Sequence, residues 1–157
     1  MTDTKNPPTS RVAIVTGAAR GIGLATATLF AEQGLFVIMV DRDEDELQLA
    51  LASLNNNSHY NHTAFVCDVS SPDAVRQMIA KALEQAGRID VLVNNAGVAD
   101  FGPIEETDFM RWRTVMETNL DGVFLCTQAA TAALKETRGT IVNIASISGL
   151  RASTLRV

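Results

Sequence analysis

The chain has 157 residues, of which 46% are hydrophobic and 20% charged, a balance typical of a single globular domain. Its 13 basic and 18 acidic residues give a formal net charge of −5, which argues against a nucleic-acid-binding surface. No apolar run approaches the roughly 18 residues of a membrane span, and neither cysteine stands in a metal-ligand spacing. The sequence therefore predicts a cytoplasmic protein with two reduced thiols, no membrane partner and no metal site, a site at His59 and His62 being disfavoured.

Residues 1–10 are polar, contain Pro7-Pro8 and lack an apolar core. We expect a flexible lead-in there, rather than a signal peptide, and one dinucleotide-binding domain over residues 11–157.

Strand and helix patterns alternate along that domain. Short, mostly β-branched apolar runs predict buried parallel strands over 12–15, 36–40, 63–67, 90–93 and 140–145. Helical spacing predicts helices over 21–33, 44–54, 74–86 and 107–135. The alternation predicts an α/β fold, a doubly wound, Rossmann-like parallel sheet of about five strands, with the ligand beyond the carboxyl ends of the strands.

Two of the helical patterns carry a predicted apolar face. In the first helix this face is formed by Ile22, Ala25, Leu29 and Phe30. In the long helix it is formed by Phe109, Trp112, Met116, Leu120, Val123 and Ala130. Both sets step at helical spacing.

Residues 16–23, here called the glycine loop, lie between the first strand and the first helix. Its glycines, Gly17, Gly21 and Gly23, permit a tight turn and a close approach to a pyrophosphate. The N–H groups of the helix's first turn then face the anion. The alternative is an ordinary αβ turn with incidental glycines.

Polar residues follow each predicted strand, and they should meet at the same rim as the glycine loop. They are Thr16, Asp41, Asp68, Asn94, Asn95 and Ser146. Asp41 stands roughly 18 residues after Gly23, where a carboxylate accepts hydrogen bonds from a ribose 2′-hydroxyl and repels a 2′-phosphate. It therefore favours NAD over NADP, although Arg20 and Arg42 could each pair with a phosphate. The alternative for Asp41 is a solvated loop acid. Asp68 could accept a hydrogen bond from an adenine amino group, or serve as a capping or loop acid.

Five motifs stand in the order and at the approximate spacings of the short-chain dehydrogenase/reductase family. They are 16–23, Asp68-Val69, 94–97, Asn119 within 117–120, and the serine segment 141–149. The chain resembles this family from residue 11 to about residue 150.

The resemblance implies a role for each motif. The pyrophosphate would be held by Gly17, Gly21, Ile22 and Gly23, with Arg20 beside them. Asn95, Ala96 and Gly97 would line the adenosine-ribose side of the cofactor. Asp68 and Val69 would complete the cofactor site. Ser146 would hydrogen-bond the substrate oxygen, and Asn119 would help hold a water-mediated proton relay. The family's serine precedes a glycine by three positions, which selects Ser146 over Ser148.

The family also uses a Tyr-x-x-x-Lys pair, whose tyrosine is the general acid/base and whose lysine lowers the pKa of that tyrosine. The only tyrosine here is Tyr60, in an Asn-rich loop, and its i+4 position is Ala64. In the family the tyrosine falls at or just beyond the position of Val157. The resemblance thus implies the amino-terminal portion of a family member, with a sheet incomplete at its carboxyl end and an uncovered fifth strand.

Two functional interpretations follow. The first is an NAD(P)-dependent oxidoreductase of the short-chain type, interconverting a small secondary alcohol and a ketone. NAD is the favoured cofactor. The family implies a homo-oligomer, although this portion holds only part of the subunit interface that the family uses. The second interpretation is an inactive dinucleotide-binding or vestigial module.

Overall fold

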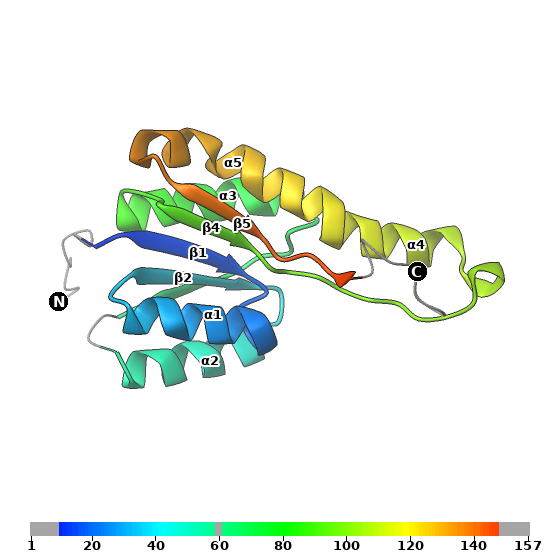
Figure 1. The fold of residues 1–157 in the computed structure, drawn as a ribbon, viewed down its shortest axis with the longest axis horizontal. Helices are drawn as coiled ribbons and strands as arrows, with labels where there is room; N and C mark the ends of the chain where they lie inside the picture. The colour runs from blue at the N-terminus through cyan, green and yellow to red at the C-terminus, as the bar shows by residue number, and fades with distance from the viewer. Residues whose placement is uncertain (1–9, 59–60, 148–157) are drawn as a thin grey trace.

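The computed structural model describes residues 10–58 and 61–147 and confirms the doubly wound α/β fold (Figure 1). The strands are β1 (Val12–Thr16), β2 (Phe36–Asp41), β3 (Thr63–Val66), β4 (Val91–Asn94) and β5 (Thr140–Asn143). The helices are α1 (Gly21–Glu32), α2 (Glu44–Asn56), α3 (Pro72–Ala86), α4 (Phe109–Met116) and α5 (Gly122–Thr137). A short 3-10 segment, η1 (Ile104–Glu106), precedes α4, and a π-helical segment, η2 (Glu117–Asp121), separates α4 from α5. The predicted lead-in falls mostly on residues 1–9, outside the described residues.

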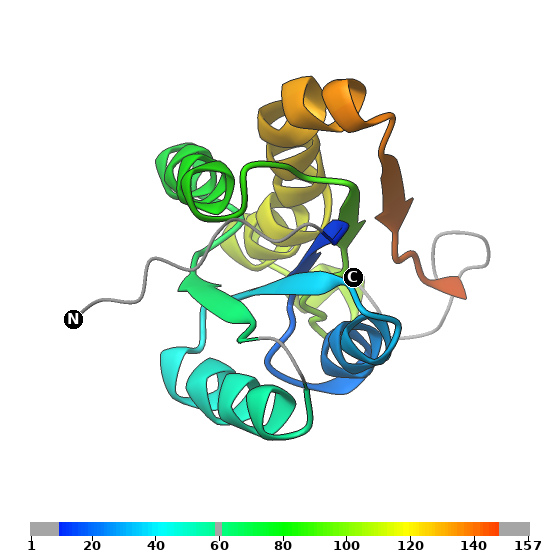
Figure 2. The same ribbon diagram turned by 90° about the vertical axis from the view of Figure 1, so that its left-hand side faces the viewer.

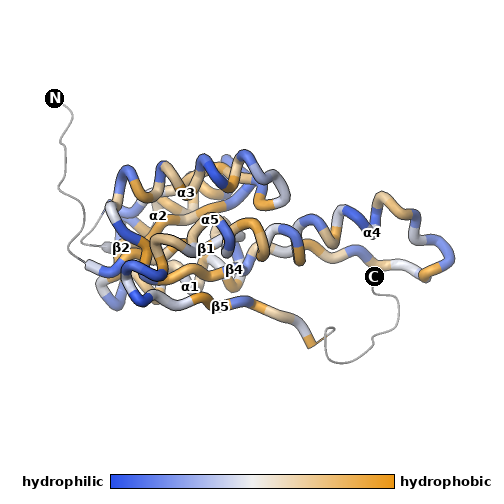
Figure 3. The backbone as a smooth tube through the Cα atoms, turned by 90° about the horizontal axis from the view of Figure 1, so that it is seen from above, coloured by the Kyte–Doolittle hydropathy of each residue, from blue (hydrophilic) through white to orange (hydrophobic). Residues whose placement is uncertain are grey.

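All five described strands are parallel, in the order β3-β2-β1-β4-β5. Helices α1 and α2 cover one face of the sheet, and α3 and α5 cover the other (Figure 2). Every residue of β1 is buried, and its side chains alternate between the two resulting cores, with Ile14 in one and Val15 in the other. Figure 3 shows these central strands as hydrophobic segments between helices that alternate in hydropathy. The strand order places the carboxyl ends of β1, β2 and β4 side by side at one rim.

The apolar residues predicted for α1 are mostly exposed, although Phe30 packs against the core. Ile22 is 63% exposed and Leu29 is 54% exposed. The buried residues of α1 are small ones, Gly23, Ala27 and Ala31, spaced four apart. Small side chains on one stripe let the helix backbone lie close to the sheet. The buried face of α1 is therefore the one with the smallest side chains, not the one with the most hydrophobic side chains.

The long helix predicted over 107–135 is confirmed as one helical run over 109–137, made of α4, η2 and α5. Its middle turn, η2, is π-helical, and its α4 part extends past the sheet, as Figure 1 shows. Phe109, Trp112 and Leu120 are consequently exposed, while Ala130 in α5 is fully buried. The Phe109 and Trp112 rings stack on each other with centroids 5.7 Å apart. Helical spacing located the apolar residues correctly, but in α4 no described strand or helix lies against them.

Strand β5 lies at the edge of the sheet, as predicted. Its apolar residues Ile141 and Val142, and Ile144 just beyond it, are exposed. Asn94 at the end of β4 fixes this edge, because its Nδ2 donates a hydrogen bond to Asn143 Oδ1 at 2.9 Å. Within residues 10–58 and 61–147, no helix combines the length and the apolar character that a membrane span requires.

Candidate functional site

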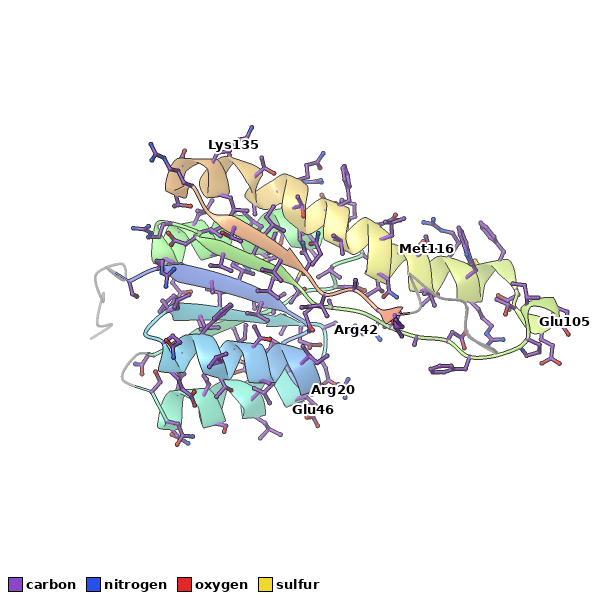
Figure 4. The ribbon with its side chains drawn as sticks, in the orientation of Figure 1. Arg20, Arg42, Glu46, Glu105, Met116 and Lys135 are labelled. Atoms are coloured by element: carbon purple, nitrogen blue, oxygen red, sulfur yellow. The ribbon has the colours of Figure 1, made fainter. Side chains whose placement is uncertain are left out.

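A pocket of about 240 Å³ opens beyond the carboxyl ends of β1, β2 and β4. Its lining residues are Gly17, Arg20, Asp41, Arg42, Cys67, Asp68, Val69, Asn95, Ala96, Gly97, Val98 and Thr118. The structure thus gathers the residues predicted for the cofactor site, apart from Gly21, Ile22 and Gly23 on the adjoining first turn of α1. Figure 4 shows Arg20 and Arg42 beside the tips of the strands, with Glu46 close by and Lys135 towards the opposite end of the sheet.

The glycine loop packs tightly against the segment that follows β4. Gly17 has a positive φ of +63°, and a Cβ there would lie 2.8 Å from Ala96 Cα. A Cβ on Gly23 would collide with the Gly17 carbonyl oxygen. Both glycines are therefore required by the close approach of two backbone segments, and Gly17 also by its left-handed conformation.

The first turn of α1 has no side-chain cap. Its N-cap residue, Arg20, makes no capping hydrogen bond, and no acidic residue stands in the turn. By contrast, α2, α3 and α4 are capped by Asp43, Ser71 and Asp108. The α1 amides at the pocket are thus left to an external acceptor, which the positive end of the helix dipole would favour as an anion.

Thr16 connects the glycine loop to the loop after β4. Its Oγ1 accepts hydrogen bonds from the N–H groups of Asn95 and Ala96, each at 3.0 Å, and donates to the Val93 carbonyl. Asn95 also connects the two loops, because its Nδ2 donates hydrogen bonds to the carbonyls of Thr16 and Gly17. The buried hydroxyl of Thr16 and the amide of Asn95 therefore fix the two loops relative to each other.

Replacing Thr16 by valine should lower the free energy of unfolding by about 2 kcal/mol, because two backbone donors lose their acceptor while the volume is kept. Urea unfolding followed by circular dichroism measures the change. Thr16→Ser keeps the hydroxyl, so it should lose less than half of the unfolding free energy that Thr16→Val loses. If the serine variant were as unstable as the valine variant, packing of the methyl group would matter as much as the hydroxyl, and the special role of the hydroxyl would be contradicted.

Asp41 has a backbone role in addition to its place in the pocket lining. Its Oδ2 accepts a hydrogen bond from Ala19 N–H at 3.1 Å, and its Oδ1 accepts one from Asp43 N–H at 3.2 Å. One carboxylate thus holds the glycine loop and the start of α2 around the end of β2.

Asp68 lines the pocket and also organises the turn before α3. Its Oδ1 accepts hydrogen bonds from Ser70 N–H and Ser70 Oγ. Burial acts to raise the pKa of Asp68, but these hydrogen bonds and the charge of Arg42 outweigh it and lower the pKa overall. The neighbouring Cys67 thiol has its pKa raised to about 11 by burial and by the Asp68 charge, so it stays protonated near neutral pH.

The predicted catalytic residues lie outside the pocket lining. Asn119, in η2, is exposed and pairs with the backbone of Val98: its Oδ1 accepts from Val98 N–H and its Nδ2 donates to Val98 O, each at 2.8 Å. Ser146 follows β5 and is exposed. Ser148, the alternative serine, is outside the described residues, as is Tyr60.

Three lining residues were not predicted from the sequence: Cys67, Val98 and Thr118. Each is adjacent to a residue that was predicted, namely Asp68, Gly97 or Asn119. The available signal was therefore adjacency to a motif, since their own residue types carry no binding chemistry of note.

No group of three or more His, Cys, Asp or Glu side chains in the described part of the chain could hold a metal ion. His62 is buried, its Nδ1 accepts a hydrogen bond from Val37 N–H at 3.1 Å, and its Nε2 lies 2.8 Å from Ser58 Oγ. Burial lowers the pKa of His62, so the neutral ring links β2 to the loop before β3. His59 lies outside the described residues.

The parallel sheet, the tight glycine loop and the pocket beyond the strand ends define a doubly wound α/β protein of the nucleotide-binding class. The chain belongs to the short chain dehydrogenase family, because residues 11–156 match the model of that family.

Relatives of known name and solved structures agree with this assignment. The meso-2,3-butanediol dehydrogenase of Serratia marcescens is 39% identical over 141 residues, which are 90% of this chain and 55% of that protein. A short chain dehydrogenase/reductase from Burkholderia phymatum in complex with NAD superposes with a TM-score of 0.90 at 30% identity, over 94% of this chain and 53% of that one. An alcohol dehydrogenase from Thermococcus sibiricus, complexed with 5-hydroxy-NADP, gives 0.89 at 32% identity, over 93% and 62%. The chain thus spans little more than half the length of these proteins.

Proposed function

We propose that this chain forms the cofactor-binding part of an NAD-dependent dehydrogenase that interconverts a small secondary alcohol and a ketone. The observation that carries the proposal is the meeting of the glycine loop, Asp41, Asp68 and segment 95–97 around one pocket. The names of the relatives support the reaction class, since the Serratia protein is a dehydrogenase of a diol and two similar structures contain NAD or an NADP derivative.

The residues present fit a dinucleotide. Nothing lies within 4 Å of where a Cβ on Gly21 would stand, and the first turn of α1 has no side-chain cap. The N–H groups at Gly21, Ile22 and Gly23 would hold the pyrophosphate beside Gly17 and Arg20. The adenosine side would be held by Asp41, Asp68, Val69, Asn95, Ala96 and Gly97. When bound, the nicotinamide supplies the hydride acceptor or donor for the alcohol carbon.

NAD is the proposed form of the cofactor. The Asp41 carboxylate lies in the pocket lining at the end of β2, where it would accept hydrogen bonds from ribose hydroxyls and repel a 2′-phosphate. Arg20 and Arg42 line the same pocket, and they are the residues that would favour NADP.

Ser146 and Asn119 are the proposed catalytic residues. Ser146 would hydrogen-bond the substrate oxygen and orient it for hydride transfer. Asn119 would help hold the water-mediated relay by which the substrate proton leaves, from a helix segment already tied to Val98. Assembly as a homo-oligomer is supported by the exposed apolar side chains of α4, Phe109, Met110 and Trp112.

A second candidate function is dinucleotide binding without turnover. The sequence favours it for the 157-residue chain, because no lysine follows Tyr60, the single tyrosine, by four positions. An unperturbed phenol titrates near pH 10, so a tyrosine without a nearby cation is a poor proton carrier at neutral pH.

Two measurements on the purified chain separate these candidates. We expect calorimetric titration to show NAD binding, and assays of NADH absorbance with secondary alcohols to show no turnover. Turnover would overturn the inactivity of the chain, and an absence of dinucleotide binding would overturn the proposed function as a whole. Gly34→Ala, far from the pocket, serves as the control variant for binding.

A further inference from the structure

Asp43, two residues beyond Asp41, contacts a cation of the pocket. Its Oδ2 lies 3.6 Å from Arg20 Nη2. Its other oxygen, Oδ1, accepts the hydrogen bond from Glu46 N–H that caps α2. The two functions of this carboxylate therefore use different atoms, so the ion pair can be removed while the cap is kept.

The ion pair matters because the Arg20 guanidinium is a largely exposed cation at the end of a long side chain. The Arg20 side chain is 72% exposed, and the Asp43 side chain is 36% exposed. A long, solvated guanidinium takes its position from whichever anion attracts it most. In the unliganded pocket that anion is Asp43, and a 2′-phosphate at the end of β2 would compete for the same guanidinium.

The Asp41 carboxylate already accepts hydrogen bonds within the protein. Both of its oxygens accept backbone N–H groups, from Ala19 and from Asp43. Arg42 also lines the pocket, so the rim carries two cations that could bind a 2′-phosphate against one acid at the end of β2. A further acid that pairs with Arg20 would weaken the attraction of this arginine for a phosphate.

We infer that Asp43 is a positioning residue for cofactor choice: by holding Arg20 it withholds this arginine from a 2′-phosphate and favours NAD over NADP. The inference rests on the proposed function, dinucleotide binding in this pocket. Asp43 does not touch the reacting atoms. Its effect reaches the cofactor through Arg20 and through its own negative charge near the 2′ position.

The test is calorimetric titration of the whole chain and of Asp43→Asn with NAD⁺ and with NADP⁺ at low salt. Asparagine keeps an Oδ1 that caps α2 as well as aspartate does. Affinity for NADP⁺ should rise about three- to fivefold, the range of an exposed ion pair, while affinity for NAD⁺ stays within about twofold. At about 0.5 M NaCl the gain should shrink, because exposed charges are screened.

Two further variants separate the ion pair from other effects. Asp45→Asn removes one negative charge from the same turn of α2, and it should leave the ratio of the two affinities nearly unchanged. Asp43→Ala removes both the ion pair and the cap, so it should lose stability but show the same ratio as Asp43→Asn. An equal gain in Asp45→Asn would show that net charge is responsible and would overturn the inference.

The failure of this inference can be told apart from the failure of the proposed function. If the chain binds NAD⁺ and Asp43→Asn leaves NADP⁺ affinity unchanged, the role of Asp43 is wrong and dinucleotide binding stands. If the unsubstituted chain binds neither dinucleotide, the proposed function is wrong and this inference falls with it.

Discussion

Gly23→Ala should lower the free energy of unfolding by about 3 kcal/mol, at the upper end of what overpacking costs. It should also weaken NAD binding by about tenfold or more, equivalent to 1.4 kcal/mol. The added methyl group would collide with the Gly17 carbonyl and lie 2.5 Å from Asn95 Nδ2. Neither neighbour can move freely, because Asn95 Nδ2 donates to that same carbonyl at 3.0 Å. Relief of the collision must therefore displace the glycine loop from the loop after β4.

Gly34→Ala is the matched control. Gly34 has a positive φ of +81° but open space where a Cβ would lie, whereas the φ of Gly23 is not in the left-handed region. The Gly34 variant should therefore show only the backbone cost of about 1 kcal/mol, with unchanged NAD affinity. Urea unfolding and calorimetric titration check both variants. A loss in Gly23→Ala no larger than that in Gly34→Ala would show that the crowded contact is relieved at little cost, and it would contradict this prediction.

The fold could be predicted because its signals are local. Each strand is a short apolar run that ends at a polar residue, and the helices between them have helical spacing. The buried face of α1 could not be predicted in this way, since Ile22 and Leu29 are the more hydrophobic choices. The face that is buried, Gly23 with Ala27 and Ala31, is selected by how closely the helix lies on the sheet. That distance is a tertiary property which no window of the sequence contains.

The candidate site was predictable to the extent that it is built from motifs. Asp41, Asp68 and Asn95 stand directly after strands, and a parallel sheet brings strand ends together. What spacing does not reveal is how a side chain divides its hydrogen bonds. The Asn119 amide is taken up by Val98, and both oxygens of Asp41 are taken up by backbone N–H groups. These partners lie far along the chain or on turn backbone, so only the assembled rim shows them.

The residue whose loss should cost most stability away from the pocket is Asp90, at the opposite end of the sheet. Its Oδ2 accepts hydrogen bonds from Val12 N–H at 2.8 Å and from Arg88 Nε at 2.9 Å, and its Oδ1 accepts one from Arg88 Nη2 at 2.6 Å. Asp90→Ala should lower the free energy of unfolding by about 3 kcal/mol at neutral pH, because a buried N–H and a cation lose their acceptor. NAD affinity of the folded chain should not change.

The pH dependence of this loss identifies the carboxylate as its cause. Burial acts to raise the pKa of Asp90, but hydrogen bonds from Arg88 and Val12 and the charges of Arg88 and Arg11 lower it overall. The pKa in the folded chain is thus below that of the unfolded chain, about 3.9. The stabilisation is therefore present above about pH 4 and is lost as the pH falls through the folded pKa. The difference between Asp90→Ala and the unsubstituted chain should shrink in urea titrations taken from pH 7 towards pH 3.

Asp73→Ala provides the comparison, since Asp73 also pairs with an arginine, Arg76, but on the exposed surface of α3. It should cost about 0.5 kcal/mol, because a solvated pair gains little from contact. A loss at Asp73 as large as that at Asp90 would mean that helix charge, not the buried link between β1 and β4, dominates. A pH-independent loss at Asp90 would instead assign its role to packing, because a methyl-sized gap does not titrate.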